Sequence, residues 1–452
     1  MTKNTYFLVS LGCSKNTVDS DSIAFMLNQA GYFPVTKPAQ AEILIVNTCG
    51  FIQPARQESL ETLAELAKGK KETQLLVAAG CMPETHRKDI IESIPGVDGI
   101  IGTRRWMDMV TFIQKIRTKK DSTPFLYDPH PSKFSSVDPS IPRYTIQGAS
   151  AYLKIADGCR RTCTFCSIPM IKGTLQSREV EVILNEAVNL QEKGVLEINL
   201  IAQDTTDYGH DLGIEDGLSH LLAKMIPLVP DVPWIRLLYA YPGFVTDRLI
   251  GLMAEQPQIL PYLDLPLQHA HPDILKKMGR PANIDWVYKT IEKIRNIIPK
   301  ICLRSTFIVG FPGETENEFR TLLEFIKTIQ FDRVGAFEYS FEKGTPAETY
   351  GDPIPQEIKQ ARLEELMKIQ ETISLMKNQS LVGNTLPVLV EGRDKDISVG
   401  RTYRDAPEVD GLVVIYGKVP VGKIVPVVIS EAMVHDLAGF PAKSITGQRQ
   451  SL

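Results

Sequence analysis

Short apolar runs alternate with helical patterns along most of the chain, and this alternation constrains the fold more than any other feature of the sequence. In the first third of the chain, strands are predicted at residues 6–11, 42–47, 74–79 and 97–101. Helices are predicted between them at residues 18–30, 55–67, 84–94 and 106–116. Such alternation is typical of βαβ units with right-handed crossovers. Residues 4–118 are therefore predicted to form a doubly wound α/β domain around a parallel sheet.

The alternation stops at residues 119–144, which are rich in proline and serine and are predicted to be a linker. Six further strands are predicted at residues 151–156, 196–202, 234–240, 263–267, 301–309 and 334–339. Helical patterns separate them, for example at residues 182–193, 218–228 and 316–329. Six successive βα units predict a complete or partial parallel (β/α) barrel over residues 145–376, with its chemistry at the C-terminal ends of the strands.

The last part of the chain changes to a β pattern. A charged amphipathic helix is predicted at residues 355–377, and it leads the chain away from the barrel. Short strands are predicted beyond it at residues 385–390, 412–416 and 424–429. Residues 379–445 are therefore predicted to form a small C-terminal all-β barrel.

The chain has seven cysteines among 452 residues, with no apolar run long enough for a membrane span. An odd number of dispersed cysteines argues against a secreted disulfide framework and favours a reducing cytoplasm. The net charge is −4, so the chain as a whole does not strongly attract nucleic acid or anionic lipid. We therefore expect the thiols to act as metal ligands, nucleophiles or buried apolar groups.

Three cysteines lie on one loop directly after the first predicted barrel strand. Cys159, Cys163 and Cys166 have the spacing C-x3-C-x2-C. Three thiolates on a tight loop can hold three corners of a four-iron, four-sulfur cluster and leave one iron open for substrate chemistry. A structural zinc site is the alternative, but it requires a fourth ligand, and the next histidine is His210.

This motif at the start of a βα barrel resembles the radical S-adenosylmethionine (SAM) enzymes. The resemblance implies that the open iron binds SAM and that one electron cleaves it to a 5′-deoxyadenosyl radical, which abstracts a hydrogen from an unactivated C–H bond. The protein would then supply orientation and exclude water. Candidate cofactor-binding residues are one aromatic residue of the motif and residues at the strand ends, namely Phe165, Gln203, Tyr239, His269 and Gly310.

The N-terminal domain contains a second group of three cysteines. Cys13, Cys49 and Cys81 each follow the apolar run of a different βα unit, beside a glycine. Because the C-terminal ends of parallel strands lie at one edge of a sheet, the three thiols are expected to converge. The alternative is that they are three buried apolar cysteines, although such cysteines belong within strands rather than just past them.

A radical SAM core between a three-cysteine α/β domain and a small β-barrel resembles the methylthiotransferases over essentially the whole chain. The resemblance implies two [4Fe-4S] clusters, an auxiliary one on Cys13, Cys49 and Cys81 and a radical-generating one on Cys159, Cys163 and Cys166. It also implies two SAM molecules per turnover, a low-potential electron donor, a sulfur donor and a TRAM-like C-terminal barrel. Cys302 lies inside an apolar strand and is interpreted as an inert core residue.

The methylthiotransferases divide between enzymes that act on tRNA adenosines and enzymes that act on an aspartate of ribosomal protein S-twelve. Three passages here resemble the protein-modifying branch, at residues 11–20, 265–280 and 400–411. The resemblance implies that ribosomal protein S-twelve, free or in the small ribosomal subunit, is the partner and that its aspartate receives a methylthio group on the β-carbon. The candidate recognition residues lie in the last passage and are Arg401, Arg404, Asp405, Glu408 and Asp410.

Charge favours the same substrate. Residues 382–452 carry eight basic and eight acidic side chains, whereas a module that binds tRNA is expected to be positive. Acidic side chains suit a basic ribosomal protein, although on charge alone they also fit a solvated turn. Two alternatives stay open, a tRNA methylthiotransferase and a non-catalytic iron-sulfur electron carrier.

Overall fold

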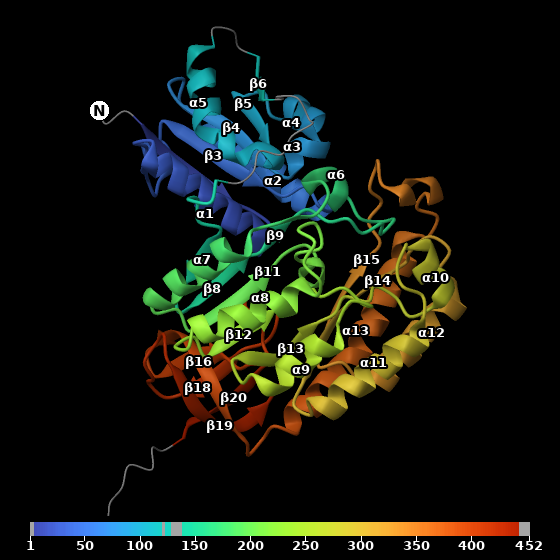
Figure 1. The fold of residues 1–452 in the computed structure, drawn as a ribbon. Coiled ribbons are helices and arrows are strands. Elements are labelled where there is room, and N and C mark those ends of the chain that lie inside the picture. Colours follow the sequence, from blue (N-terminus) through green and yellow to red (C-terminus); the bar gives the residue numbers. More distant parts are fainter. Residues whose placement is uncertain (1–3, 120–122, 128–137, 443–452) are drawn as a thin grey trace, which may run out of the picture.

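The computed structural model describes residues 4–119, 123–127 and 138–442. The chain forms an N-terminal α/β domain, a central α/β core and a C-terminal β-barrel (Figure 1). No helix of the described residues is long and apolar enough to cross a membrane.

The N-terminal domain is a doubly wound parallel sheet, which confirms the predicted fold class. The strand order is β2-β1-β3-β4-β5-β6, and every neighbouring pair is parallel. Odd and even residues of β3 face opposite sides of the sheet. Ile43 and Ile45 pack with α1 and α5, whereas Leu44 and Val46 pack with α2 and α4. The elements of this domain are β1 (Thr5–Ser10), α1 (Ser14–Gln29), β2 (Phe33–Pro34), η1 (Pro38–Gln40), β3 (Ile43–Thr48), α2 (Gln53–Gly69), β4 (Leu75–Gly80), α3 (Met82–Thr85), α4 (Arg87–Ser93), β5 (Gly99–Gly102), η2 (Thr103–Asp108), α5 (Met109–Thr118) and β6 (Phe125–Tyr127).

Strand β6 corrects the prediction of an irregular linker at residues 119–144. It pairs with β5, and its Phe125 and Tyr127 rings both lie within 6 Å of the Phe112 ring of α5, at 5.7 and 5.6 Å. Aromatic packing therefore stabilises a three-residue strand in a segment whose composition favours loops. Residues 120–122 and 128–137 of the predicted linker lie outside the described residues.

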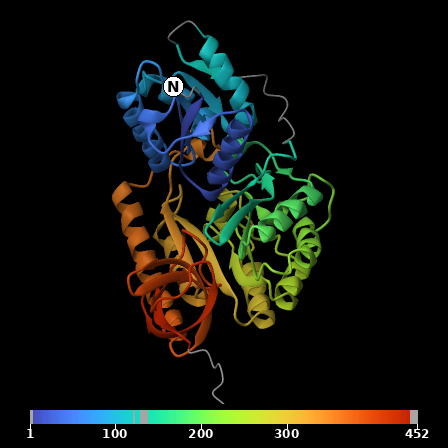
Figure 2. The ribbon, with the colours of Figure 1, turned by 90° about the vertical axis from the view of Figure 1, so that its left-hand side faces the viewer.

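The central core is an open seven-stranded sheet, so the partial form of the predicted barrel is confirmed. The order is β15-β14-β13-β12-β11-β8-β7; only β7 runs antiparallel to its neighbour. The helices α7, α8, α9, α11 and α12 pack on one face of the sheet through apolar side chains. Figure 2 shows this core below the N-terminal domain. The elements are β7 (Tyr144–Gln147), β8 (Ser150–Lys154), β9 (Ala156–Asp157), α6 (Ile168–Lys172), β10 (Gln176–Ser177), α7 (Val180–Glu192), β11 (Glu197–Ile201), η3 (Thr205–Asp207), α8 (Gly217–Met225), η4 (Ile226–Leu228), β12 (Trp234–Leu237), α9 (Asp247–Glu255), β13 (Ile259–Asp264), α10 (Pro272–Lys277), α11 (Ile284–Ile297), β14 (Cys302–Val309), α12 (Glu316–Ile329), β15 (Arg333–Glu338) and η5 (Pro346–Tyr350).

The fourth core strand was predicted too late in the chain. Strand β13 spans Ile259–Asp264, whereas the sequence predicted a strand at residues 263–267. Pro261 lies inside the strand, which obscured its start, and Pro266 lacks the N–H that a continued ladder would need.

The C-terminal barrel is closed, with the strand order β16-β17-β18-β20-β19. Helix α13 (Gln356–Gln379) precedes it, close to the predicted helix. Two strands, β17 and β20, were missed because each is only five residues long and contains a glycine. The barrel strands are β16 (Thr385–Asp394), β17 (Ile397–Arg401), β18 (Val413–Tyr416), β19 (Ile424–Ala432) and β20 (Leu437–Pro441).

Candidate active site

One cavity of about 440 Å³ is lined by six of the seven cysteines. It lies between the N-terminal domain and the central core, at the C-terminal ends of parallel strands from both sheets. The residues that line it include Cys13, Cys49, Cys81, Cys159, Cys163 and Cys166. The structure therefore brings together two groups of thiols that lie about 80 to 150 residues apart in sequence, at the strand ends where ligands bind in α/β folds.

The N-terminal group comes from three neighbouring strands. Cys13 follows β1, Cys49 follows β3 and Cys81 follows β4. Gly12 permits their close approach, because a Cβ atom added there would lie 2.8 Å from Cys49 Cβ. Its φ of +88° also favours glycine. The thiols thus converge at the point where the strand order reverses between β1 and β3, as the topology predicts.

The second group lies on the loop between β9 and α6, and backbone hydrogen bonds fix that loop. The N–H of Cys159 donates to Gly173 O at 3.0 Å, and the N–H of Thr164 donates to Met278 O at 2.9 Å. Two donors point at the sulfur atoms. The N–H of Arg161 lies 3.4 Å from Cys159 Sγ, and Arg280 Nη1 lies 3.6 Å from Cys163 Sγ.

Burial governs the ionisation of most of these thiols. It raises the pKa of Cys81 and Cys166 to about 12 and that of Cys159 to about 11. Cys13 differs: burial opposes its ionisation, but Lys15, backbone amides and Lys172 together outweigh burial and lower its pKa. Neutral thiols in such a site become thiolates when a metal supplies positive charge. The donor set therefore fits iron-sulfur ligation.

All six cavity cysteines are free thiols. Within the described ranges, no three His, Cys, Asp or Glu side chains lie close enough together to hold one metal ion. A four-iron cluster does not require such closeness, because each thiolate binds a different iron. Three thiols in the wall of a roomy cavity fit this arrangement.

Three of the predicted cofactor residues line the same cavity, namely Phe165, Gln203 and Tyr239. Tyr239 has a φ of +62°, and the neighbouring cavity residue Gln268 has a φ of +76°. Such conformations cost free energy for residues other than glycine and are concentrated at functional sites. The side-chain oxygen of Gln268 is also buried without a hydrogen-bond partner. Gln268 directly precedes the predicted cofactor residue His269, but the sequence does not show this strain.

The predicted cofactor residues His269 and Gly310 do not line this cavity. His269 Nε2 lies 3.1 Å from Glu314 Oε2, and the N–H of Gly310 donates to Glu314 Oε1 at 3.0 Å. Arg362 of α13 pairs with the same carboxylate at 2.7 Å. Through Glu314, these two residues join the strand ends to α13, and their role in binding the cofactor stays a prediction.

Four of the five predicted recognition residues are buried in contacts within the chain. Arg401 pairs with Glu197, Arg404 with Asp332, and Asp405 with Arg333. Asp410 accepts a hydrogen bond from Tyr262 Oη at 2.6 Å and lies 3.4 Å from Arg304 Nε. These four residues hold the barrel against the core sheet and do not face a partner, which corrects their predicted role.

Glu408 is the one exposed member of that set. It accepts a hydrogen bond from Gln147 Nε2 at 2.9 Å. With Pro407 and Val409 it lines a second cavity of about 320 Å³, whose wall also contains Cys13 and Tyr239. A loop of the C-terminal barrel thus reaches the neighbourhood of the N-terminal thiols.

Several functional candidates gave no sequence signal. Lys15, Arg161, Lys172 and Arg280 are cationic residues of the main cavity wall. The Lys15 ammonium lies 3.1 Å from the centre of the Tyr239 ring, and the Arg161 guanidinium lies 3.7 Å from that of Phe244. Lys15 and Arg280 lie in passages that the resemblance singled out, but neither was named as a functional candidate.

Comparisons with known proteins agree with this architecture. The radical SAM superfamily matches residues 153–326, the uncharacterized protein family UPF0004 matches residues 5–102, and the TRAM domain matches residues 382–441. Among solved structures, the radical S-adenosylmethionine methyltransferase TsrM from Kitasatospora setae is similar in fold. It has a TM-score of 0.56 at 14% identity and covers 77% of this chain and 74% of its own.

Curated relatives are similar over nearly their full length. The ribosomal protein uS12 methylthiotransferase RimO of Chloroflexus aurantiacus is 44% identical, covering 96% of this chain and 99% of the relative. The protein of the same name from Gloeothece citriformis is 43% identical, covering 97% and 98%. Identity at this level, over the whole N-terminal domain, radical SAM core and barrel, shows that the chain belongs to the RimO family of radical SAM methylthiotransferases.

Proposed function

We propose that this chain transfers a methylthio group to the β-carbon of an aspartate in ribosomal protein uS12. The observation that carries the proposal is the single cavity walled by two groups of three thiols. The relatives that share this architecture over their full length are named for uS12. Ribosomal protein uS12, free or in the small subunit, is accordingly the proposed partner, in the cytoplasm.

Two [4Fe-4S] clusters are part of the proposal. Cys159, Cys163 and Cys166 would hold the one that binds SAM, and Cys13, Cys49 and Cys81 the auxiliary one. When bound, the two clusters supply the electron that cleaves SAM and the sulfur that is methylated and transferred. A low-potential electron donor, a sulfur donor and two SAM molecules per turnover complete the proposal.

The residues of the cavity wall orient the reactants and exclude water. Phe51, Phe165 and Phe337 contribute apolar surface to the wall, and a dry site strengthens every electrostatic contact within it. Arg161 is held by Asp204 at 2.7 Å, so its backbone N–H and its charge keep a fixed place beside Cys159. Arg280 similarly donates toward Cys163 Sγ. Fixed donors of this kind act without reorganising during the reaction.

The second cavity is the proposed entry for the substrate. Its wall combines the loop residues Pro407, Glu408 and Val409 with Cys13 and Tyr239 of the main cavity. Val409 is 56% exposed and Glu408 is also exposed, so this loop offers an apolar and an acidic contact to an incoming segment. A basic protein segment fits this surface better than an RNA backbone does.

The test is an anaerobic assay of the iron-reconstituted enzyme with SAM, a reductant and sulfide. A uS12 protein and a tRNA are offered in parallel, and each is digested and examined by mass spectrometry. We expect CH2S to be added to one aspartate of uS12 and the tRNA adenosines to stay unmodified. Modification of tRNA alone would replace the proposed substrate, and absence of 5′-deoxyadenosine would favour an electron carrier.

A further inference from the structure

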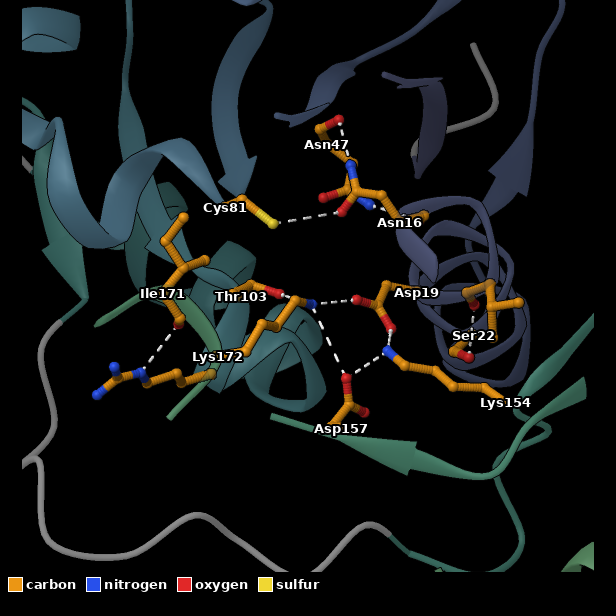
Figure 3. A network of polar contacts seen from close by, with 12 residues as sticks. Asn16, Asp19, Ser22, Asn47, Cys81, Thr103, Lys154, Asp157, Ile171 and Lys172 are labelled. Atoms are coloured by element: carbon orange, nitrogen blue, oxygen red, sulfur yellow. Dashed lines mark hydrogen bonds and ion pairs between the residues drawn. The ribbon is translucent and has the colours of Figure 1, made fainter. Parts of the chain in front are cut away.

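Lys172 belongs to the wall of the cavity that both groups of thiols line. It is the last residue of α6, the helix that directly follows the loop of Cys159, Cys163 and Cys166. Its side chain is only 6% exposed and lines the main cavity. The ammonium is held at 2.6 Å from both Asp19 Oδ2 and Thr103 Oγ1, two residues of the N-terminal domain (Figure 3). A residue of the radical SAM core thus places its charge in the N-terminal domain.

The charges around Lys172 do not cancel. Asp19 also pairs with Lys154 at 2.7 Å and with Arg143 at 2.6 Å, and Asp157 contacts both of these cations. Three cations and two carboxylates leave an excess of one positive charge among these five linked side chains. Glu84, a further carboxylate near Lys172, is already paired with Arg104. An uncompensated buried charge is costly, so this arrangement favours an anion in the adjoining cavity.

The negative charge available there is that of the N-terminal thiols. Lys172 lines the same cavity of about 440 Å³ as Cys13, Cys49 and Cys81. Because opposite charges attract strongly in a site that excludes water, the Lys172 ammonium and these thiolates are expected to stabilise one another.

Lys154 provides a natural comparison. It is fully buried and binds the same carboxylate of Asp19, but it does not line the cavity. If Lys172 served only to join the two domains, the two lysines would be equivalent. Only Lys172 lines the cavity, so a comparison of the two lysines distinguishes a structural role, which both can have, from an electrostatic role toward the thiolates.

We propose that Lys172 is a positioning residue of the auxiliary site: its ammonium compensates the negative charge of the thiolates of Cys13, Cys49 and Cys81 when they hold a cluster, and so raises the reduction potential of that cluster. A nearby positive charge stabilises the more negative, reduced form. This inference rests on the proposed function, since it requires the auxiliary cluster.

The test uses the full-length reconstituted holoenzyme and redox titration followed by electron paramagnetic resonance. Addition of SAM distinguishes the two clusters, because SAM is expected to alter the signal of the first cluster only. We expect Lys172→Met to lower the midpoint potential of the auxiliary cluster, Lys172→Arg to restore it to near the wild-type value, and Lys154→Met to leave it close to wild type. The iron content is measured in every variant.

The midpoint potentials and the iron contents together decide whether the proposal holds. An unchanged potential in Lys172→Met at full iron content, or an equal fall in Lys154→Met, would overturn the proposal. If Lys172→Met loses the auxiliary iron while Lys172→Arg and Lys154→Met keep it, the result supports the proposal. If Lys172→Met and Lys154→Met both lose that iron, the result overturns the proposal. Iron at half the expected content in the wild type would instead refute the auxiliary cluster itself.

Discussion

Glu197 at the start of β11 and Arg401 at the end of β17 form a buried ion pair, with Oε2 and Nη2 2.5 Å apart. Arg236 of β12 binds the other oxygen of Glu197 at 2.9 Å. The side chain of Glu197 is fully buried and that of Arg401 is 3% exposed. The pair holds the C-terminal barrel against the core sheet. It thereby also positions the barrel loop of Pro407, Glu408 and Val409, which lines the second cavity.

Arg401→Met is expected to loosen the barrel from the core. Removal of one partner of a buried ion pair costs about 3 to 5 kcal/mol. We expect a cost of about 3 kcal/mol here, because Glu197 stays buried but keeps Arg236 as a cationic partner. We expect amide hydrogen exchange in residues 402–411 to become roughly a hundredfold faster, since about 1.4 kcal/mol corresponds to a factor of ten.

The matched control is Lys418→Met in the same barrel. Lys418 and Asp396 form an ion pair at 3.0 Å whose side chains are 61% and 88% exposed. Exposed pairs contribute about 0 to 1 kcal/mol, so exchange in residues 402–411 is expected to stay near wild type. Equal effects of the two substitutions would contradict the role given to Arg401.

The same contact predicts a dependence on pH. Burial opposes the ionisation of Glu197, but Arg236 and Arg401 outweigh it and lower its pKa to about 2. The unfolded value is about 4.3, so the carboxylate contributes stability that is present above this pH and is lost as the pH falls toward 2. In urea titrations, the stability advantage of wild type over Glu197→Gln is expected to stay constant from about pH 7 to 5 and to shrink below about pH 4. An advantage that grows on acidification would be inconsistent with this sign.

Much of the fold was predictable because the spacing of apolar residues along the sequence indicates which faces of a helix or strand are buried. Strand β3 carries apolar residues that face both sides, Ile43 and Ile45 on one and Leu44 and Val46 on the other, as expected of a parallel strand covered by helices. Helix α12 matches its predicted bounds of residues 316–329, because Thr315 and Glu318 form a capping box and the apolar pattern follows at once. Strand β6 was missed because its stabilisation comes from Phe112, a distant residue.

The sequence predicted those parts of the site that follow from the order and direction of the strands. Parallel strands end at one edge of a sheet, and this rule alone predicts that Cys13, Cys49 and Cys81 lie together. Side-chain partners do not follow from topology. Asp405 and Asp410 were expected to face a partner because the sequence does not show that Arg333 and Arg304 lie opposite them inside the core.

Gly279→Ala is expected to disrupt the loop of Cys159, Cys163 and Cys166. Gly279 has a φ of +64°, and an added Cβ would lie 2.4 Å from Thr162 O and 3.5 Å from Cys163 Cα. The backbone must shift, so we expect the variant to lose about half of the iron, or about four of eight atoms, and to form no 5′-deoxyadenosine. Iron content and 5′-deoxyadenosine are measured on the reconstituted protein.

Gly194→Ala is the control for the free-energy cost of placing alanine at a positive φ, without a steric clash. Gly194 has a φ of +79°, and an added Cβ would meet nothing within 4 Å. Its strain costs about 1 kcal/mol without a steric contact, so the iron content and the formation of 5′-deoxyadenosine are expected to stay at wild-type levels. If both alanine variants lost iron, a general loss of stability would explain the result for Gly279.

The two groups of thiols are expected to divide the reaction between them. Cys163→Ala removes a thiol from the radical SAM loop and is expected to abolish both 5′-deoxyadenosine formation and methylthiolation of uS12. Cys81→Ala changes only the N-terminal group, so we expect it to keep the cleavage of SAM and to lose methylthiolation. Cys302→Ala serves as the control, because this buried thiol contacts Arg404 O at 3.4 Å, outside the main cavity, and both activities should persist. Equal loss of both activities in Cys81→Ala would show that the two groups do not act as separate sites.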